Sequence, residues 1–101
     1  MIVIFTTCGS RKEAERIARA LLRERLIACV NMWPVRSVYR FKAKVEQARE
    51  WAVLCKTRNA LARRLEARLY ALHSYDLPVI EQWEVKRTSR GVLKWIAEVT
   101  R

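Results

Sequence analysis

The sequence predicts an α+β fold: a ferredoxin-like antiparallel sheet with two helices on one face, followed by an extra C-terminal helix. Apolar β-branched runs indicate strands and amphipathic stretches indicate helices. Their order is strand–helix–strand–strand–helix–strand–helix, and the first six elements match the ferredoxin-like pattern. The chain has 101 residues, 51% of them hydrophobic, which is enough for one core. One domain is therefore expected over residues 1–101.

The first strand and helix are predicted over residues 2–5 and about 11–25. The first run is apolar and β-branched, as expected of a strand buried on both faces. Ser10 and Glu13 have the spacing of a capping box, in which each side chain satisfies a free amide at the helix start. Apolar residues then recur at helical spacing and form one stripe: Ala14, Ile17, Ala18, Leu21 and Leu22.

Two long strands are predicted over residues 28–41 and 45–56, with a polar hairpin tip at residues 42–44. Pro34 interrupts the first of these strands. Because proline cannot donate to a strand ladder, it is expected at a sheet edge or a bulge. Strands this long exceed what one small domain can cover. The hairpin is therefore expected to protrude or to pair with another chain.

The last third of the chain predicts a helix, a connector, a strand and a final helix. Thr57 or Asn59 is expected to cap the first of these helices. Its apolar stripe is formed by leucines: Leu61, Leu65, Leu69 and Leu72. A connector over residues 73–78 leads to a strand over residues 79–86, and Ser89 starts the final helix.

The formal net charge of +11 would favour polyanions such as nucleic acid. The basic residues are, however, interleaved with glutamates at helical spacing, a pattern typical of exposed helix faces. Ferredoxin-like sheets can bind RNA through aromatic residues, but the RNP1 pattern is absent. Nucleic-acid binding is therefore the alternative function. An apolar sheet face is expected to be buried in a subunit contact instead.

Neither a membrane span nor a signal peptide is predicted. No apolar run approaches the roughly 18 residues that a membrane span requires. The N-terminus lacks a basic segment and a small-residue cleavage site. We therefore expect a cytoplasmic protein with no membrane partner.

No catalytic constellation can be assembled from these residues, so no enzyme and no obligatory cofactor is predicted. Cys8, Cys29 and Cys55 form no C-x-x-C pair, and each lies in or beside an apolar run, where cysteine is usually a small buried hydrophobe. Glu46 and Glu50 are candidate carboxylates that we expect at the surface or in a subunit contact.

A metal site is conceivable on topological grounds. In a ferredoxin-like fold, the end of the first strand and the start of the last strand share one end of the sheet, which places Cys8 near His73. A thiolate and an imidazole suit copper or zinc. Only these two ligands are visible, with Asp76 as a possible third, so such a site would be weak or completed by another chain. The alternative is a capping histidine and an unliganded cysteine.

Several motifs in one order resemble the CutA divalent-cation-tolerance family. They are Ala28-Cys29-Val30-Asn31, Pro34, Ser37-Val38-Tyr39, Lys44-Val45-Glu46, Lys56-Thr57, His73-Ser74-Tyr75-Asp76-Leu77-Pro78 and Leu93-Lys94-Trp95-Ile96. Together they span nearly the whole chain. Ser74 stands where the family usually has proline, a change expected to loosen the chain before the last strand. Ala43 stands where it usually has glycine, which bears on the geometry of the hairpin tip.

The resemblance implies a homotrimer, similar in architecture to the PII signalling proteins, that takes part in tolerance of divalent metal ions such as copper. Weak binding of Cu²⁺ or another divalent cation is expected, with His73 and Cys8 as the candidate ligands. The resemblance also implies a ligand or signal site in a cleft between subunits. The matching polar positions are Lys44, Glu46, Lys56, Tyr75 and Asp76, beside His73.

Overall fold

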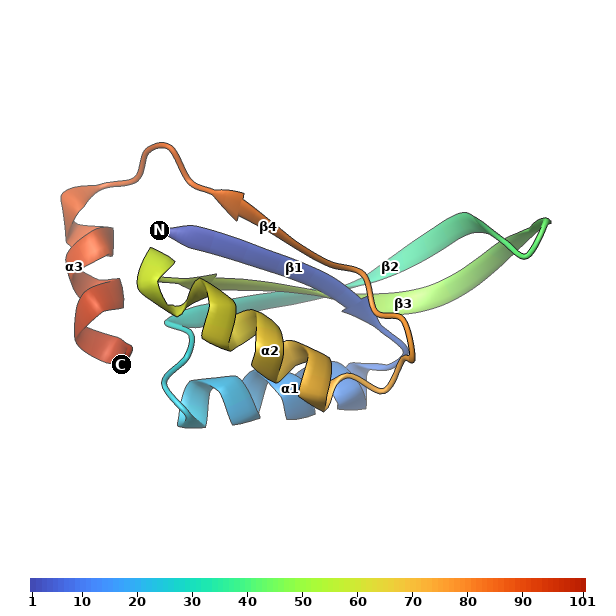
Figure 1. Cartoon of the computed structure of the whole chain (residues 1–101), viewed down its shortest axis with the longest axis horizontal. Helices are drawn as coiled ribbons and strands as arrows, with labels where there is room; N and C mark the ends of the chain where they lie inside the picture. Colours follow the sequence, from blue (N-terminus) through green and yellow to red (C-terminus); the bar gives the residue numbers. More distant parts are fainter.

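The computed structural model describes residues 1–101 and contains one four-stranded antiparallel sheet and three α-helices (Figure 1). The α+β class and the predicted order of elements are confirmed. The elements are β1 (Ile2–Cys8), α1 (Arg11–Arg23), β2 (Cys29–Phe41), β3 (Lys44–Thr57), the 3₁₀ turn η1 (Asn59–Leu61), α2 (Ala62–Leu72), β4 (Ile80–Glu84) and α3 (Arg90–Val99). The strand order is β2-β3-β1-β4. No helix has the length and apolar character needed to cross a membrane.

Helices α1 and α2 lie on one side of the sheet, and the core lies between them and the strands (Figure 1). On β1, every second residue from Ile2 to Cys8 is buried and the residues between them are half-buried. The predicted burial of this strand on both faces is therefore wrong within one chain. The core residues Ile17 and Leu21 of α1 and Leu65 and Leu69 of α2 are fully buried, in agreement with the predicted stripes. The place of Leu22 in the first stripe is wrong, because this residue is 43% exposed.

The other side of the sheet is apolar and carries no helix. Because side chains alternate along a strand, the strand register identifies the residues on this side. We call it the uncovered face; its apolar centre consists of Val3, Phe5, Trp33, Leu54 and Trp83. The ring centroid of Phe5 lies 6.1 Å from that of Trp33 and 5.9 Å from that of Trp83. Trp33 remains 39% exposed and Trp83 50% exposed.

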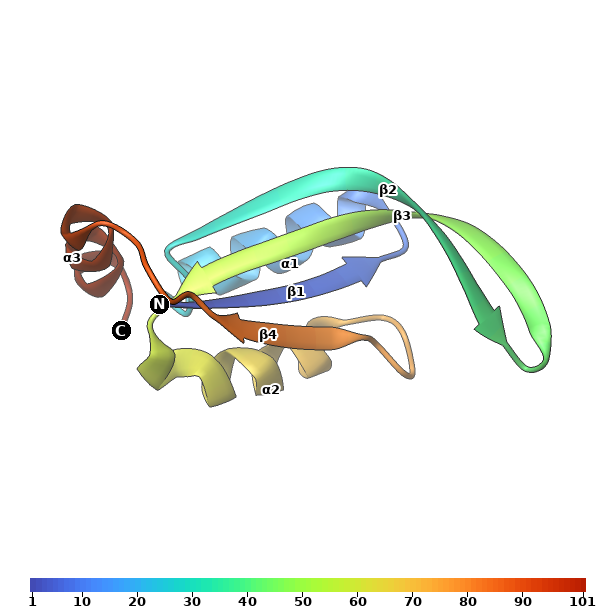
Figure 2. The ribbon, with the colours of Figure 1, turned by 90° about the horizontal axis from the view of Figure 1, so that it is seen from above.

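The β2–β3 hairpin extends well past the rest of the sheet (Figure 2). The β1–β3 ladder ends at the pair Cys8–Trp51, so residues 44–50 of β3 pair only with β2. The molecule is accordingly elongated, with extents of 45 × 26 × 22 Å. The predicted protrusion is confirmed. So is the place of Pro34, because β2 is an edge strand.

The hairpin tip is a two-residue turn with an unfavourable sequence. Lys42 and Ala43 both have positive φ, 50° and 65°. Two-residue turns with this backbone favour Asn-Gly, because other side chains are strained in the left-handed region. The change from glycine to Ala43 has therefore left the turn in place at a conformational cost.

Helix α1 starts as predicted and ends two residues early. The Ser10 hydroxyl accepts a hydrogen bond from the Glu13 amide at 3.1 Å. The second half of the capping box is wrong, because the Glu13 carboxylate accepts from the amide of Gly9 instead of Ser10. After the helix, Arg25 has φ 57°, and its amide donates a hydrogen bond to the Leu22 carbonyl oxygen. Helix ends with this left-handed backbone usually have glycine at that position.

The start of α2 differs from the prediction, whereas the final helix agrees with it. Neither Thr57 nor Asn59 caps α2: the turn η1 intervenes, no side chain caps either helix start, and the buried Thr57 hydroxyl has no partner. Strand β4 is shorter than predicted. Ser89 caps α3 as expected, accepting a hydrogen bond from the amide of Val92 at 3.3 Å.

Candidate functional site

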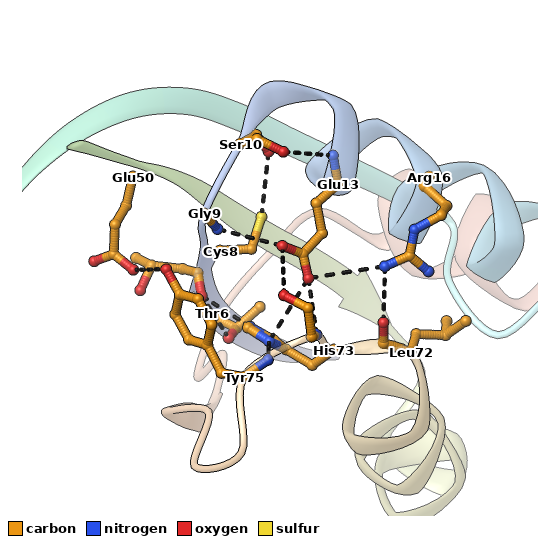
Figure 3. Close-up of polar contacts among 12 residues, drawn as sticks. Thr6, Cys8, Gly9, Ser10, Glu13, Arg16, Glu50, Leu72, His73 and Tyr75 are labelled. Carbon is orange, nitrogen blue, oxygen red and sulfur yellow. Dashed lines mark hydrogen bonds and ion pairs between the residues drawn. The ribbon is translucent and has the colours of Figure 1, made fainter. Parts of the chain in front are cut away.

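Polar side chains gather where β1 ends, α1 begins and the segment after α2 passes towards β4 (Figure 3). The imidazole of His73 is fully buried there. Its Nε2 lies 2.8 Å from the Thr7 carbonyl oxygen, and its Nδ1 lies 3.1 Å from the Tyr75 amide nitrogen. A carbonyl only accepts and an amide only donates, so the ring is the neutral tautomer with its proton on Nε2. Both ring nitrogens are thus used within the chain.

Glu13 joins α1 to the segment after α2. Its two carboxylate oxygens accept hydrogen bonds at 2.9 Å from the amide and the hydroxyl of Ser74. Burial alone would raise the pKa of Glu13, but the hydrogen bonds from Ser74 and Gly9 outweigh it and hold the pKa below its ordinary value. The expected loosening at Ser74 is therefore wrong. Proline at this position would have no amide hydrogen to donate.

Cys8 behaves as a buried thiol. Its sulfur lies 3.6 Å from the Ser10 carbonyl oxygen, and burial, with a smaller effect of the Glu13 charge, raises its pKa to about 11. Burial likewise raises the pKa of Cys55 to about 12. Cys29 is half-buried, and all three cysteines are unpaired. The prediction of small buried hydrophobes is confirmed for Cys8 and Cys55.

Cys8 and His73 lie at the same end of the sheet (Figure 3), yet they do not form a preformed metal centre. The imidazole nitrogens are both hydrogen-bonded and the thiol is protonated, whereas a metal needs deprotonated, available ligands. No group of three or more His, Cys, Asp or Glu side chains could hold a metal ion. Copper binding at these two residues stays a prediction.

Tyr75 links this cluster to β3. Its hydroxyl donates a 2.8 Å hydrogen bond to Oε2 of Glu50, and its ring centroid lies 4.8 Å from that of His73. Burial, together with the bond to Glu50, raises the pKa of the Tyr75 hydroxyl, which keeps it protonated as a donor. Glu50 is only 9% exposed. Its burial was missed because the sequence pattern around it is typical of an exposed strand.

Tyr75 and Asp76 line a pocket of about 590 Å³ beneath the hairpin. The pocket wall comprises Thr7, Tyr39, Arg40, Phe41, Glu50, Tyr75, Asp76, Leu77 and Val79. The other predicted cleft residues do not line it. Lys44 and Glu46 pair with Phe41 and Tyr39 near the tip.

Lys56 lies opposite Cys29, near the far end of β3. Ten residue steps along the strand separate it from Glu46, roughly 33 Å at the rise of an extended chain. One chain therefore brings together only Tyr75 and Asp76, beside His73. A cleft that all of these positions share between subunits stays a prediction.

Comparison with known proteins gives one consistent family. Residues 2–99 match the model of the CutA1 divalent ion tolerance protein. The divalent-cation tolerance protein CutA of Pyrococcus horikoshii is 38% identical over 101 residues, covering 100% of this chain and 99% of that protein. That of Archaeoglobus fulgidus is 39% identical, covering 94% and 93%.

Solved structures agree with the sequence matches. The crystal structure of CutA1 from Pyrococcus horikoshii superposes with a TM-score of 0.97 at 37% identity, over 100% of this chain and 99% of that one. The divalent cation tolerance protein from Thermus thermophilus gives 0.93 at 37% identity, over 100% of both chains. The chain belongs to the CutA1 family of divalent ion tolerance proteins.

Proposed function

We propose that the protein acts in tolerance of divalent metal ions as a non-enzymatic homotrimer, with a ferredoxin-like sheet and an architecture similar to the PII signalling proteins. The main observation in support of the assembly is the exposed apolar surface of the uncovered face. A single chain leaves two tryptophans and the neighbouring apolar residues of this face partly in water. Contiguous apolar surface of this kind typically marks a contact between proteins.

The hairpin supports a closed ring over a simple pair, and three copies are what the family resemblance implies. It projects beyond the sheet, so it can reach a neighbouring copy while the uncovered face packs against that copy. A contact between two different surfaces of identical chains closes into a ring when the rotation permits. Apolar burial at about 25 cal/mol per Å² would stabilise that ring.

Nucleic-acid binding is not favoured, because the basic charge does not gather on the aromatic side of the sheet. The register places two lysines there, Lys44 and Lys56, against three glutamates, Glu46, Glu50 and Glu81. Binding to the phosphate backbone depends on clustered basic side chains. The matched proteins are moreover named for divalent-cation tolerance.

A non-enzymatic role in the cytoplasm is part of the proposal. The raised pKa of Cys8 opposes its use as a nucleophile, since the thiolate is the reactive form. Both nitrogens of His73 are already engaged, which opposes its use as a general base. Fractionation of cells, with detection of the protein in the cytoplasmic fraction, tests the location.

Weak binding of Cu²⁺ or another divalent cation is the proposed chemistry. At His73 and Cys8 the metal would have to replace the hydrogen bond from Tyr75 to the imidazole and the proton of the thiol, unless another chain completes the ligand set. Both requirements lower the affinity. Cells that lack the protein should stop growing at a lower copper concentration than cells in which it is restored.

Calorimetry with Cu²⁺ tests the ligands directly. His73→Ala should lower the copper affinity of the assembled protein at least about tenfold, which corresponds to about 1.4 kcal/mol. Glu66→Gln, a change on α2, serves as the control and should leave the affinity unchanged. Equal copper binding with and without His73 would remove this residue from the proposal.

A further inference from the structure

A pocket with three arginines lies on the helix side of the molecule, where α1 ends beside α2. Its volume is about 300 Å³, and its charged lining consists of Glu24, Arg64, Arg68 and Arg101. We call it the arginine pocket. No strand contributes to its lining, so a subunit contact through the uncovered face and the hairpin does not use it.

Two of the arginines are held in place by hydrogen bonds that leave other donors free. Nε and Nη2 of Arg68 donate to the two carboxylate oxygens of Glu24 at 2.8 and 2.9 Å. Nε of Arg101 donates to the Glu24 carbonyl oxygen at 2.9 Å, and its amide donates to the Arg25 carbonyl oxygen at 3.0 Å. Nη1 of Arg68 and both Nη atoms of Arg101 remain available. Because these side chains are already ordered, a ligand that binds them loses less entropy.

Positive charge exceeds negative charge in this pocket. The hydrogen bonds from Arg68, with smaller effects of the Arg23 and Arg101 charges, hold the pKa of Glu24 below its ordinary value, so this carboxylate is ionised at neutral pH. Its single charge is matched by Arg68. Arg64 is exposed and forms no ion pair, and Arg101 has no acidic side chain as a partner. Two guanidinium charges are therefore left for a multiply charged anion.

The walls of the pocket select the kind of anion. The planar guanidinium group presents paired N–H donors that match the oxygens of a phosphate group. Ala67 and Ala71, one turn apart on α2, leave room between the arginines. No aromatic side chain lines the pocket, so a nucleic-acid base has no ring on which to stack. The pocket thus suits a compact phosphate better than a nucleotide or a nucleic acid.

We propose that the arginine pocket binds a small phosphate anion, either inorganic phosphate or the phosphate group of a small ester. Arg64 and Arg101 donate to its oxygen atoms, and the free Nη1 of Arg68 adds a third group of donors. The alanines on α2 accommodate the anion between them. The inference does not depend on the proposed role in metal tolerance.

Calorimetry with inorganic phosphate and with glycerol phosphate tests the site, on the intact assembled protein at neutral pH and constant ionic strength. Arg64→Gln should lower the affinity at least about tenfold, the usual effect of losing a hydrogen bond between charged groups. Arg63→Gln is the matched control, because Arg63 is the neighbouring exposed arginine on α2 and does not line the pocket. It removes the same charge and should weaken binding less than about twofold, since salt screens charges that do not contact the ligand.

Ala67→Leu provides a second variant that changes no charge. Ala67 is exposed on α2, where leucine is compatible with the helix, and the larger side chain would fill the pocket. This variant should weaken binding of both anions severalfold. Tighter binding of glycerol phosphate than of inorganic phosphate would support an ester as the ligand, and the reverse order would support the free ion.

Equal losses in Arg64→Gln and Arg63→Gln would overturn the proposal, because they would attribute binding to the overall charge of the protein. Failure of the wild-type protein to bind either anion would also overturn it. So would unchanged binding in Ala67→Leu.

Discussion

The two faces of the sheet differ in how completely one chain buries them. On the face towards α1 and α2, Ile4, Val53 and Cys55 have no exposed surface. On the uncovered face, Trp33 and Trp83 keep 39% and 50% of theirs, although they contact Phe5 as core residues would. The covered face therefore accounts for the fold, whereas the uncovered face accounts for an association that the single chain lacks. Substitutions on the two faces should therefore change different properties, stability on the covered side and assembly on the uncovered face.

Trp83→Glu should have the largest effect, because it puts a charge at the centre of the proposed contact. Burying an unpaired carboxylate costs several kcal/mol, and the substitution also loses about 1.5–3 kcal/mol of apolar burial at each copy of the site. Sedimentation velocity should show the trimer replaced by folded monomer. Leu22→Glu is the matched control: Leu22 is 43% exposed on α1 and lies outside the contact, so this variant should remain a trimer. If Trp83→Glu forms the same assembly as the wild-type protein, the uncovered face is not the contact between subunits.

Glu13→Gln acts on the covered side and should lower the free energy of unfolding by about 1–3 kcal/mol. This is the usual cost of disturbing a partly buried, charge-assisted hydrogen-bond network. The pKa of Glu13 is lowered in the folded chain. Its contribution to stability is therefore fully present above its unfolded value of 4.5 and is lost as the pH falls through the lower folded value.

Urea unfolding from pH 7 down to pH 3 measures this contribution. The stability difference between wild type and Glu13→Gln should shrink below about pH 4.5. Glu15→Gln, at an exposed carboxylate that pairs with Arg11, should cost less than about 1 kcal/mol throughout. A pH-independent difference for Glu13→Gln would show that its charge is not what holds Ser74.

Ala43→Gly should have the smallest effect, because the hairpin tip lies beyond the covered core. Relieving the left-handed strain at φ 65° should stabilise the protein by about 0.5–1 kcal/mol, measured as a shift in the urea midpoint. Assembly should be unchanged. A destabilising effect would mean that the alanine methyl group makes a contact that matters more than the backbone strain.

The elements that sequence reasoning recovered are those with local signals. Ser10 and Ser89 cap helices by accepting hydrogen bonds from amides three residues away. Pro34 indicates an edge strand because proline has no amide hydrogen to donate. The apolar periodicity placed the leucines of α2. These features depend on residues that are neighbours in the chain, so a pattern in the sequence reveals them.

The parts that sequence reasoning missed depend on contacts between distant residues. Glu13 was assigned only a capping role, because its bonds to Ser74 span 61 positions. Tyr75 and Glu50 are 25 positions apart. The motif around His73 identified the right segment, but both hydrogen bonds of its imidazole became evident only once β1 lay beside it. Residue types alone do not show whether the donor atoms of a proposed metal ligand are already hydrogen-bonded within the chain.

Sedimentation equilibrium of the wild-type protein at micromolar concentration tests the central claim most directly. We expect a single species with three times the 11.9 kDa mass of one chain, since the uncovered face and the projecting hairpin are buried only in an assembly. A stable monomer at that concentration would contradict it.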